Sequence, residues 1–117
     1  PLTDYGKMIN DGLAEYKKGN YDKSANIWRK VLKHNGNYDQ AYIGIGRALL
    51  REKNYKEAMD YFELKLDAKN YSKAFKLYRE VWFEENIGTI LIIIAILILL
   101  GFGVGFVKKA RREVEKG

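Results

Sequence analysis

The sequence contains no cysteine, one histidine and one proline among 117 residues. Without cysteine the chain can form no disulfide, no thiolate metal site and no cysteine nucleophile. The single histidine, His34, has no catalytic constellation of serine or carboxylate around it, and no metal-ligand spacing occurs in the sequence. We therefore expect a protein that is not an enzyme and that uses neither a metal nor a cofactor.

The net charge is also small over most of the chain, because basic and acidic side chains nearly balance. The formal charge of +6 divides into +3 for residues 1–86, with 16 basic and 13 acidic side chains, and +3 for residues 108–117. A nucleic-acid-binding surface needs a dense basic run or face, whereas the charges of residues 1–86 are mixed. We expect no nucleic-acid partner.

The first residues lack an initiator methionine and a hydrophobic region of the kind that a signal peptide needs near the N-terminus. The chain starts at Pro1 instead. We expect it to be a processed or excised C-terminal piece of a longer protein.

What the sequence does contain is a regular recurrence of tyrosine. The marker residues stand at nearly equal intervals, at Tyr5, Tyr21, Tyr38, Tyr55 and Tyr71. Asparagine precedes four of the five, and the apolar residues between markers fall at helical spacing without an internal proline. Each marker therefore indicates a helix start, and we predict helices over residues 6–18, 22–34, 39–52, 56–68 and 72–86.

Three of these helices have a candidate N-cap directly after the tyrosine. Asp22, Asp39 and Ser72 each offer a side-chain oxygen to the unpaired N–H groups of a first turn. The predicted turns are only a few residues long, and short turns make neighbouring helices antiparallel.

Two consecutive helices form a unit of about 34 residues. Superposing the first unit on the second aligns small residues with small and aromatic residues with aromatic. The aligned pairs are Ile9 with Ile43, Gly12 with Gly46, Ala14 with Ala48, Tyr21 with Tyr55, Ser24 with Ala58, Trp28 with Phe62, and Leu32 with Leu66. We expect the small residues to let paired helices approach closely and the aromatic residues to fill the space between them.

This pattern resembles the tetratricopeptide repeat (TPR) family over about residues 5–86. The family's motif of a helical glycine, a turn glycine, a tyrosine, a small residue and an aromatic residue matches Gly12, Gly19, Tyr21, Ser24 and Trp28. The second copy has Gly46, Tyr55, Ala58 and Phe62, with Lys53 in place of the turn glycine, and neither copy has the family's closing proline. The resemblance implies an all-α fold of two antiparallel helical hairpin repeats.

The predicted fifth helix is half a repeat, because no partner helix follows it before the hydrophobic segment. Helical arrays need a capping element to cover the last apolar face. We therefore predict that this helix is a cap and that Phe75, Tyr78 and Trp82 face the core rather than form a binding site.

Residues 87–107 carry no charged side chain, and Thr89 is their only polar side chain. Twenty-one residues at 1.5 Å each give a helix of about 31 Å, which matches the hydrocarbon core of a bilayer. We predict three segments: a TPR-like domain over residues 1–86, a single transmembrane helix over residues 87–107 and a basic juxtamembrane tail over residues 108–117.

The flanks of this segment predict its orientation. Trp82 precedes it as an interfacial aromatic residue, and a basic cluster follows it, formed by Lys108, Lys109, Arg111 and Arg112. Basic residues beside a span favour the cytoplasm. We therefore expect a bacterial-type plasma membrane, with the repeats extracytoplasmic and the C-terminus cytoplasmic. The alternative is a tail-anchored adaptor with cytosolic repeats, similar to the mitochondrial fission adaptor family.

Two surfaces are candidates for partner binding. Gly101 and Gly105 have the Gly-x-x-x-Gly spacing that lets transmembrane helices touch, either in a homo-oligomer or against another membrane protein. In TPR arrays the first helices of successive repeats line a concave groove. The resemblance places eight residues there: Ile9, Leu13, Tyr16, Lys17, Ile43, Arg47, Leu50 and Arg51.

We expect this groove to hold an extended or helical peptide, with Arg47 and Arg51 contacting an acidic group. The alternative is that its apolar residues pack on the capping helix. The chaperone-binding members of the family clamp a C-terminal carboxylate with lysine and asparagine, but Ile9, Leu13 and Ile43 stand at those positions, so that activity is not implied.

The sequence thus predicts a non-catalytic scaffold that holds a protein partner at a lipid bilayer. One alternative is a structural subunit of a multi-span, transporter-type complex that docks through the glycine face of its span. Another is an enzyme whose catalytic residues lie in a preceding part of a longer chain. The partner's identity does not follow from the sequence.

Overall fold

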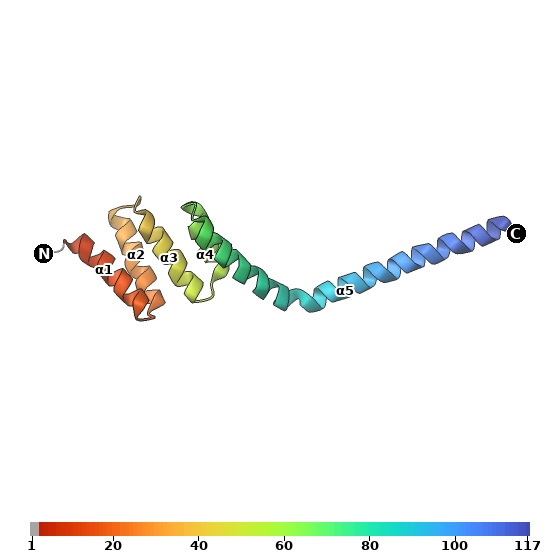
Figure 1. The fold of residues 1–117 in the computed structure, drawn as a ribbon, viewed down its shortest axis with the longest axis horizontal. Helices are drawn as coiled ribbons and strands as arrows, with labels where there is room; N and C mark the ends of the chain where they lie inside the picture. Colours follow the sequence, from red (N-terminus) through yellow and green to blue (C-terminus); the bar gives the residue numbers. More distant parts are fainter. Residues whose placement is uncertain (1–2) are drawn as a thin grey trace. The chain divides into compact units, whose positions relative to one another are not determined.

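The computed structural model describes residues 3–117, and within that range every regular element is an α-helix. The helices are α1 (Asp4–Lys17), α2 (Tyr21–His34), α3 (Asp39–Arg51), α4 (Tyr55–Leu64) and α5 (Ala68–Lys116) (Figure 1). The chain divides into two compact units, Pro1–Glu80 and Val81–Gly117. The predicted all-α class is confirmed.

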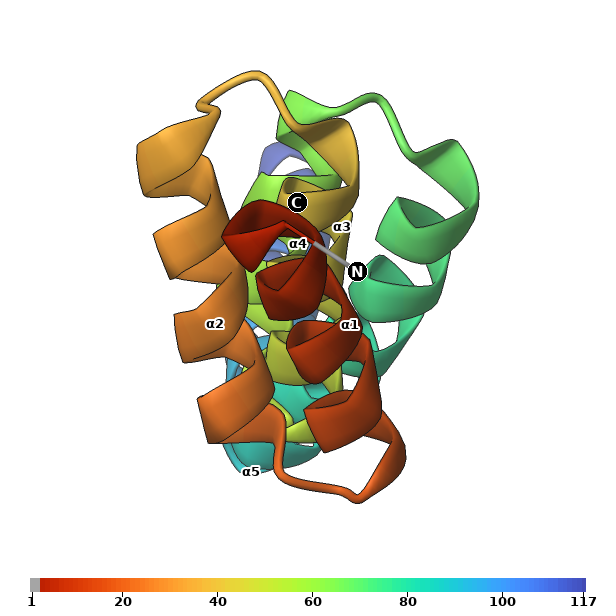
Figure 2. The ribbon, with the colours of Figure 1, turned by 90° about the vertical axis from the view of Figure 1, so that its left-hand side faces the viewer.

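The first unit is built from antiparallel helices that pack on one another in sequence order, α1 on α2, α2 on α3 and α3 on α4 (Figure 2). Glycines set how closely they pack. A Cβ atom at Gly12 would lie 3.1 Å from Cε2 of Trp28, and one at Gly46 would lie 2.6 Å from Cε1 of Phe62. The predicted pairing of glycine with an aromatic residue therefore recurs in the second repeat. Ser24 is buried in the first repeat, where its hydroxyl donates a 2.7 Å hydrogen bond to the Gly12 carbonyl.

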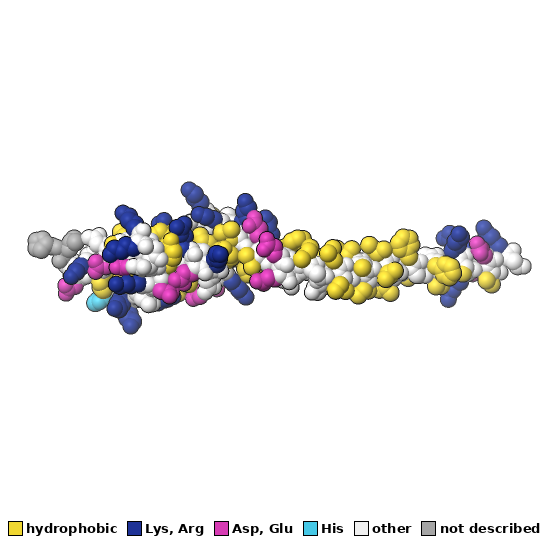
Figure 3. Space-filling view, turned by 90° about the horizontal axis from the view of Figure 1, so that it is seen from below, with side chains coloured by type: hydrophobic (Ala, Val, Ile, Leu, Met, Phe, Trp, Pro, Cys, Tyr) yellow, Lys and Arg dark blue, Asp and Glu magenta, His cyan; other side chains and the backbone are white. Residues whose placement is uncertain are grey.

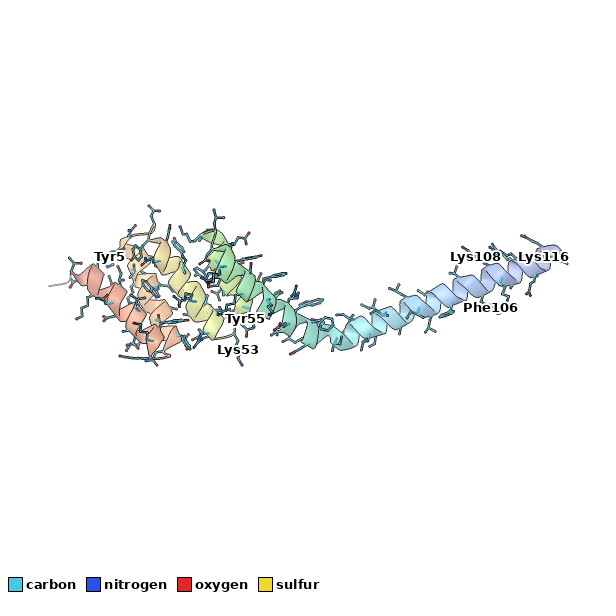
Figure 4. All side chains as sticks on the ribbon, viewed as in Figure 1. Tyr5, Lys53, Tyr55, Phe106, Lys108 and Lys116 are labelled. Atoms are coloured by element: carbon cyan, nitrogen blue, oxygen red, sulfur yellow. The ribbon has the colours of Figure 1, made fainter. Side chains whose placement is uncertain are left out.

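The turns that end α1 and α3 have the same backbone form. Gly19 has φ +85°, and Lys53, at the equivalent position of the second repeat, has φ +66°. The amide after each donates back across the turn, Asn20 to Glu15 and Asn54 to Leu49, both at 2.9 Å. This is the left-handed ending that favours glycine. Lys53, which Figure 4 labels at the turn after α3, adopts it despite its Cβ atom.

The predicted N-caps are wrong. α2 and α4 begin at the marker tyrosines themselves, Tyr21 and Tyr55, and the residues before them, Asn20 and Asn54, are the N-caps. Neither asparagine makes a side-chain cap bond. The side-chain NH2 group of each donates to a carboxylate, Asn20 to Glu15 at 2.8 Å and Asn54 to Glu57 at 2.9 Å.

The remaining two predicted caps lie inside helices. Asp39 is the first residue of α3, whose N-cap is Tyr38, and Ser72 lies within α5. A carboxylate in the first turn of a helix is still favourable there, because it opposes the helix dipole. By contrast, Thr3 caps α1 with its side chain, accepting from the Gly6 amide at 3.1 Å.

The turn between α4 and α5 comes earlier than predicted. α4 ends at Leu64 rather than residue 68, and α5 begins at Ala68 rather than residue 72. Leu66 takes a left-handed conformation with φ +53°, and Asp67 then accepts hydrogen bonds from the Asn70 amide and side chain at 3.1 and 2.7 Å. The carboxylate of Asp67 thus satisfies a first-turn amide of α5 and favours the start of the helix at Ala68.

The core of the first unit is made by buried side chains from α2 to α5. They are Trp28, Val31, Ala41, Ile45, Leu49, Leu50, Ala58, Phe62 and Ala74. On α5 the core-facing residue is Ala74, with Tyr71 and Leu77 packed beside it.

The prediction that Phe75 and Trp82 face the core is therefore wrong, since they are 42% and 48% exposed. Ala74 is the small residue that allows close approach. Phe75 follows it directly and so lies about 100° further round the helix.

The second unit belongs entirely to α5, which continues to Lys116. The predicted helix end at residue 86 is wrong, because no helix break separates the expected span from its flanks. An 18-residue window of α5 has a mean hydropathy of 3.2, with none of it buried, so the helix is long and apolar enough to cross a membrane. Figure 3 shows the hydrophobic side chains of this unit as a long band, interrupted by one white stretch, before the basic cluster near its C-terminal end.

Candidate functional site

A cavity of about 320 Å³ lies between α1 and α3, and we call it the α1–α3 groove. Four of the predicted groove residues line it: Leu13 and Tyr16 from α1, and Ile43 and Arg47 from α3. They come together because α1 and α3 are the first helices of consecutive repeats, with α2 packed against both. The groove combines apolar walls with one basic side chain.

Aromatic rings hold the two predicted arginines. The guanidinium carbon of Arg47 lies 4.9 Å from the ring centroid of Tyr16, and that of Arg51 lies 5.4 Å from the centroid of Tyr21. Arg51 Nε also donates to the Tyr21 hydroxyl at 3.0 Å, a hydrogen bond that raises the pKa of the guanidinium. Both cations are therefore pre-positioned at the surface, where an acidic group can reach them.

The other predicted groove residues do not line the cavity. Leu50 is buried in the core, and Ile9 is half-buried against it. Lys17 is exposed at the end of α1, and Arg51 lies over Tyr21 instead. The prediction that Leu50 lines the groove is wrong, because its side chain is buried in the core.

Three further residues that the sequence did not predict line the cavity, Trp28, Gln40 and Gly44. Gln40 and Gly44 share a helix face with Ile43 and Arg47, at the spacing i, i+3, i+4 and i+7, so helical periodicity could have identified them. Trp28 reaches the cavity floor from α2, because Gly44 leaves room for its ring. That contact has no signal in a single sequence.

The lining of the groove carries little charge. Its only charged lining residue is Arg47, and His34 is exposed elsewhere with a tyrosine, Tyr5, as its aromatic neighbour at 6.5 Å. Over residues 3–117 no three histidine or carboxylate side chains are grouped so as to hold a metal ion.

The predicted membrane-facing residues all lie on α5. Trp82 is half exposed, and the basic residues Lys108, Lys109, Arg111 and Arg112 are exposed beyond Phe106 and Val107 (Figure 4). A Cβ atom at Gly101 or Gly105 would meet no other atom within 4 Å. The glycine face is therefore open.

The repeats match a family model. Residues 10–73 match the model described as tetratricopeptide repeat, a range that covers the matched small and aromatic positions of both hairpins. No curated protein and no solved structure matches the chain. The recurring hairpins, the glycine–aromatic contacts and this match together assign the chain to the tetratricopeptide repeat family.

Proposed function

We propose that this protein is a non-catalytic scaffold that is tethered to a lipid bilayer by α5 and that binds a protein partner in the α1–α3 groove. Tetratricopeptide repeats are protein–protein interaction modules and are generally non-catalytic. Beyond this family property, we propose that α5 is a membrane tether and that the partner binds in the α1–α3 groove.

One observation carries the tether. The apolar window of α5 has a mean hydropathy of 3.2 and is entirely unburied. A helix with apolar side chains on every face is stable in water only when protein or lipid covers it. In the second unit of the chain, no other element covers these side chains.

Membrane extraction tests the tether on the full chain expressed in bacteria. We expect the protein to stay in the membrane pellet after alkaline carbonate washing. The double variant Ile94→Arg/Leu97→Arg should be released, because each arginine near the middle of a span costs about 2.5–3.5 kcal/mol. Val114→Arg, which lies beyond the basic cluster, is the matched control and should stay in the pellet. Recovery of the wild type in solution without detergent would refute the tether.

The orientation that we propose has the repeats extracytoplasmic and the basic cluster in the cytoplasm of a bacterial-type cell. Its support is the charge asymmetry across the apolar stretch. Protease added to intact spheroplasts should digest the repeats. Their survival would favour the tail-anchored alternative.

The groove is supported by its lining, since apolar walls beside Arg47 suit a peptide that carries apolar and acidic side chains. A photo-crosslinking amino acid at Leu13, which is 47% exposed, tests it in cells. We expect a protein adduct from Leu13 that is lost in an Arg47→Glu background. The same label at the exposed Lys30 on α2 should give no such adduct. Identical adducts from both positions would refute the groove.

The Gly-x-x-x-Gly spacing of Gly101 and Gly105 favours a second candidate, a structural subunit of a multi-span complex. Gly101 and Gly105 leave space where a neighbouring helix backbone could approach. Replacing both by leucine separates the candidates. Loss of a detergent-stable complex would favour the subunit, and an unchanged complex would favour the simple tether.

A further inference from the structure

The start of α5 repeats the register of α3 without the helix that should cover it. Ala41 of α3 and Ala74 of α5, which stand one repeat apart, are both fully buried. In this register Tyr42 of α3 corresponds to Phe75 of α5. The Tyr42 ring lies 6.5 Å from the ring of Tyr61 on α4. Phe75 is 42% exposed in the equivalent place, and over the described residues 3–80 no helix follows the start of α5 to cover it.

Phe75, Tyr71 and Leu66 form an apolar strip, which we call the α5 face. Leu66 is 88% exposed at its N-terminal end, beside a cavity of about 450 Å³ that Phe62, Ala68 and Tyr71 also line, with Glu63 and Asp67 at its rim. The rings of Tyr71 and Phe75 stack at 6.4 Å between centroids. A surface of this kind marks an interaction site when it is contiguous rather than scattered.

Along residues 68–79 the edge of the α5 face is basic. Residues 68–79 contain Lys69, Lys73, Lys76 and Arg79 and no acidic residue. Lys69 and Lys76 directly follow Ala68 and Phe75 in sequence, so they lie along one side of the apolar strip. Arg79 meets the strip itself, with its guanidinium carbon 5.7 Å from the Phe75 ring centroid.

We propose that the α5 face docks an amphipathic helix of a partner protein, which brings apolar side chains onto Phe75 and Leu66 and acidic side chains against Lys69, Lys76 and Arg79. The partner helix completes the third repeat. A second copy of this chain is disfavoured, because its own α5 face would bring cations against cations. A lipid headgroup surface is disfavoured by Glu80, which follows the basic edge directly.

The chain's own second helices provide matched probes. A peptide of residues 54–67 and a peptide of residues 20–33 have the same length. Both begin with Asn-Tyr, and both carry an aromatic residue at the ninth position, Phe62 and Trp28. Their formal charges are −2 and +3, respectively. The proposal predicts that only the acidic peptide binds.

The experiment is fluorescence anisotropy of each labelled peptide with the full chain in phosphatidylcholine nanodiscs. We expect saturable binding of the 54–67 peptide, weakened on the order of tenfold or more by Phe75→Asp. Val114→Asp, the same kind of change at an exposed site in the C-terminal tail, should leave binding unaltered. The triple variant Lys69→Glu/Lys76→Glu/Arg79→Glu should lose the 54–67 peptide and gain the 20–33 peptide. That exchange keeps the test valid even if Phe75→Asp misfolds.

Other outcomes overturn the proposal. These are no binding of either peptide, equal binding of both, or binding that Phe75→Asp does not change. If the peptides fail while the chain self-associates through Phe75, the occupant is a second copy. If they fail while anionic vesicles bind in a Phe75-dependent way, the occupant is lipid. The groove variant Arg47→Glu should not affect peptide binding here, so this proposal and the proposed function can fail separately.

Discussion

The Trp28 ring lies directly against the backbone of Gly44, so that a Cβ atom at residue 44 would be only 2.5 Å from Nε1 of the indole. The same ring also meets Gly12 of α1, where a Cβ atom would be 3.1 Å away. One aromatic residue of α2 therefore sets the approach of both first helices and forms the floor of the α1–α3 groove.

We predict that Gly44→Ala destabilises the first unit by about 1–3 kcal/mol, because an added methyl overpacks a filled site. Gly12→Ala should cost less, since its gap is wider and alanine also favours the helix. Thermal unfolding followed by Trp28 fluorescence, in a Trp82→Phe background, measures both. Gly101→Ala, with open space around it, is the control. Equal effects of Gly44→Ala and Gly101→Ala would contradict the packing described.

Phe62 and Phe75 should contribute very differently to the stability of the first unit. Phe62 is fully buried, and Phe62→Ala should lower the free energy of unfolding by about 3–5 kcal/mol. Phe75 is 42% exposed, and Phe75→Ala should cost about 1 kcal/mol or less. Chemical denaturation of both variants under the same conditions is the measurement. A large loss for Phe75→Ala would restore the idea that it faces the core.

The left-handed turn at Lys53 predicts a stabilising substitution. Lys53→Gly should raise the free energy of unfolding by up to about 1 kcal/mol, because glycine adopts positive φ without a Cβ clash. The gain is reduced by the larger entropy of glycine in the unfolded chain. Gly19→Lys, at the equivalent turn, should destabilise by a similar amount. A fall in melting temperature for Lys53→Gly would contradict this prediction.

Glu15 makes the stability of the first unit depend on pH. The hydrogen bond that it accepts from Asn20, with Lys18 and Lys23 nearby at 3.6 and 3.7 Å, lowers the pKa of its carboxyl. A depressed folded-state pKa stabilises the fold above the ordinary glutamate pKa of about 4.3, and this stabilisation is lost as pH falls below it.

Glu15→Gln should therefore lower the melting temperature slightly at pH 7 and not at pH 3. The effect should be small, because Lys18 and Lys23 are exposed and solvent screens their attraction to Glu15. Glu80→Gln is the control at an exposed position, and an equal pH-dependent loss there would assign the effect to net charge.

The local pattern of the sequence was sufficient for the repeats. Spacing of tyrosines and apolar residues identified five helices, because a buried helical face imposes its period on the sequence. The superposition of the two repeats also paired Gly12 with Gly46 and Trp28 with Phe62, and the glycine–aromatic contacts that these residues make recur in the structure. The length of the apolar stretch, residues 87–107, and its lack of charged side chains can be read directly from the sequence.

Only the tertiary structure decided which faces are covered. The turn at Leu66 and the cap at Asp67 start α5 early, and the buried contact of Ala74 then leaves Phe75 outside. Tertiary packing likewise decided that Leu50 lies in the core and that Trp28 forms the floor of the groove. A single sequence gives the period of a helix, but the rotation of its face depends on neighbours that lie far away in the chain, and those neighbours meet only in the folded protein.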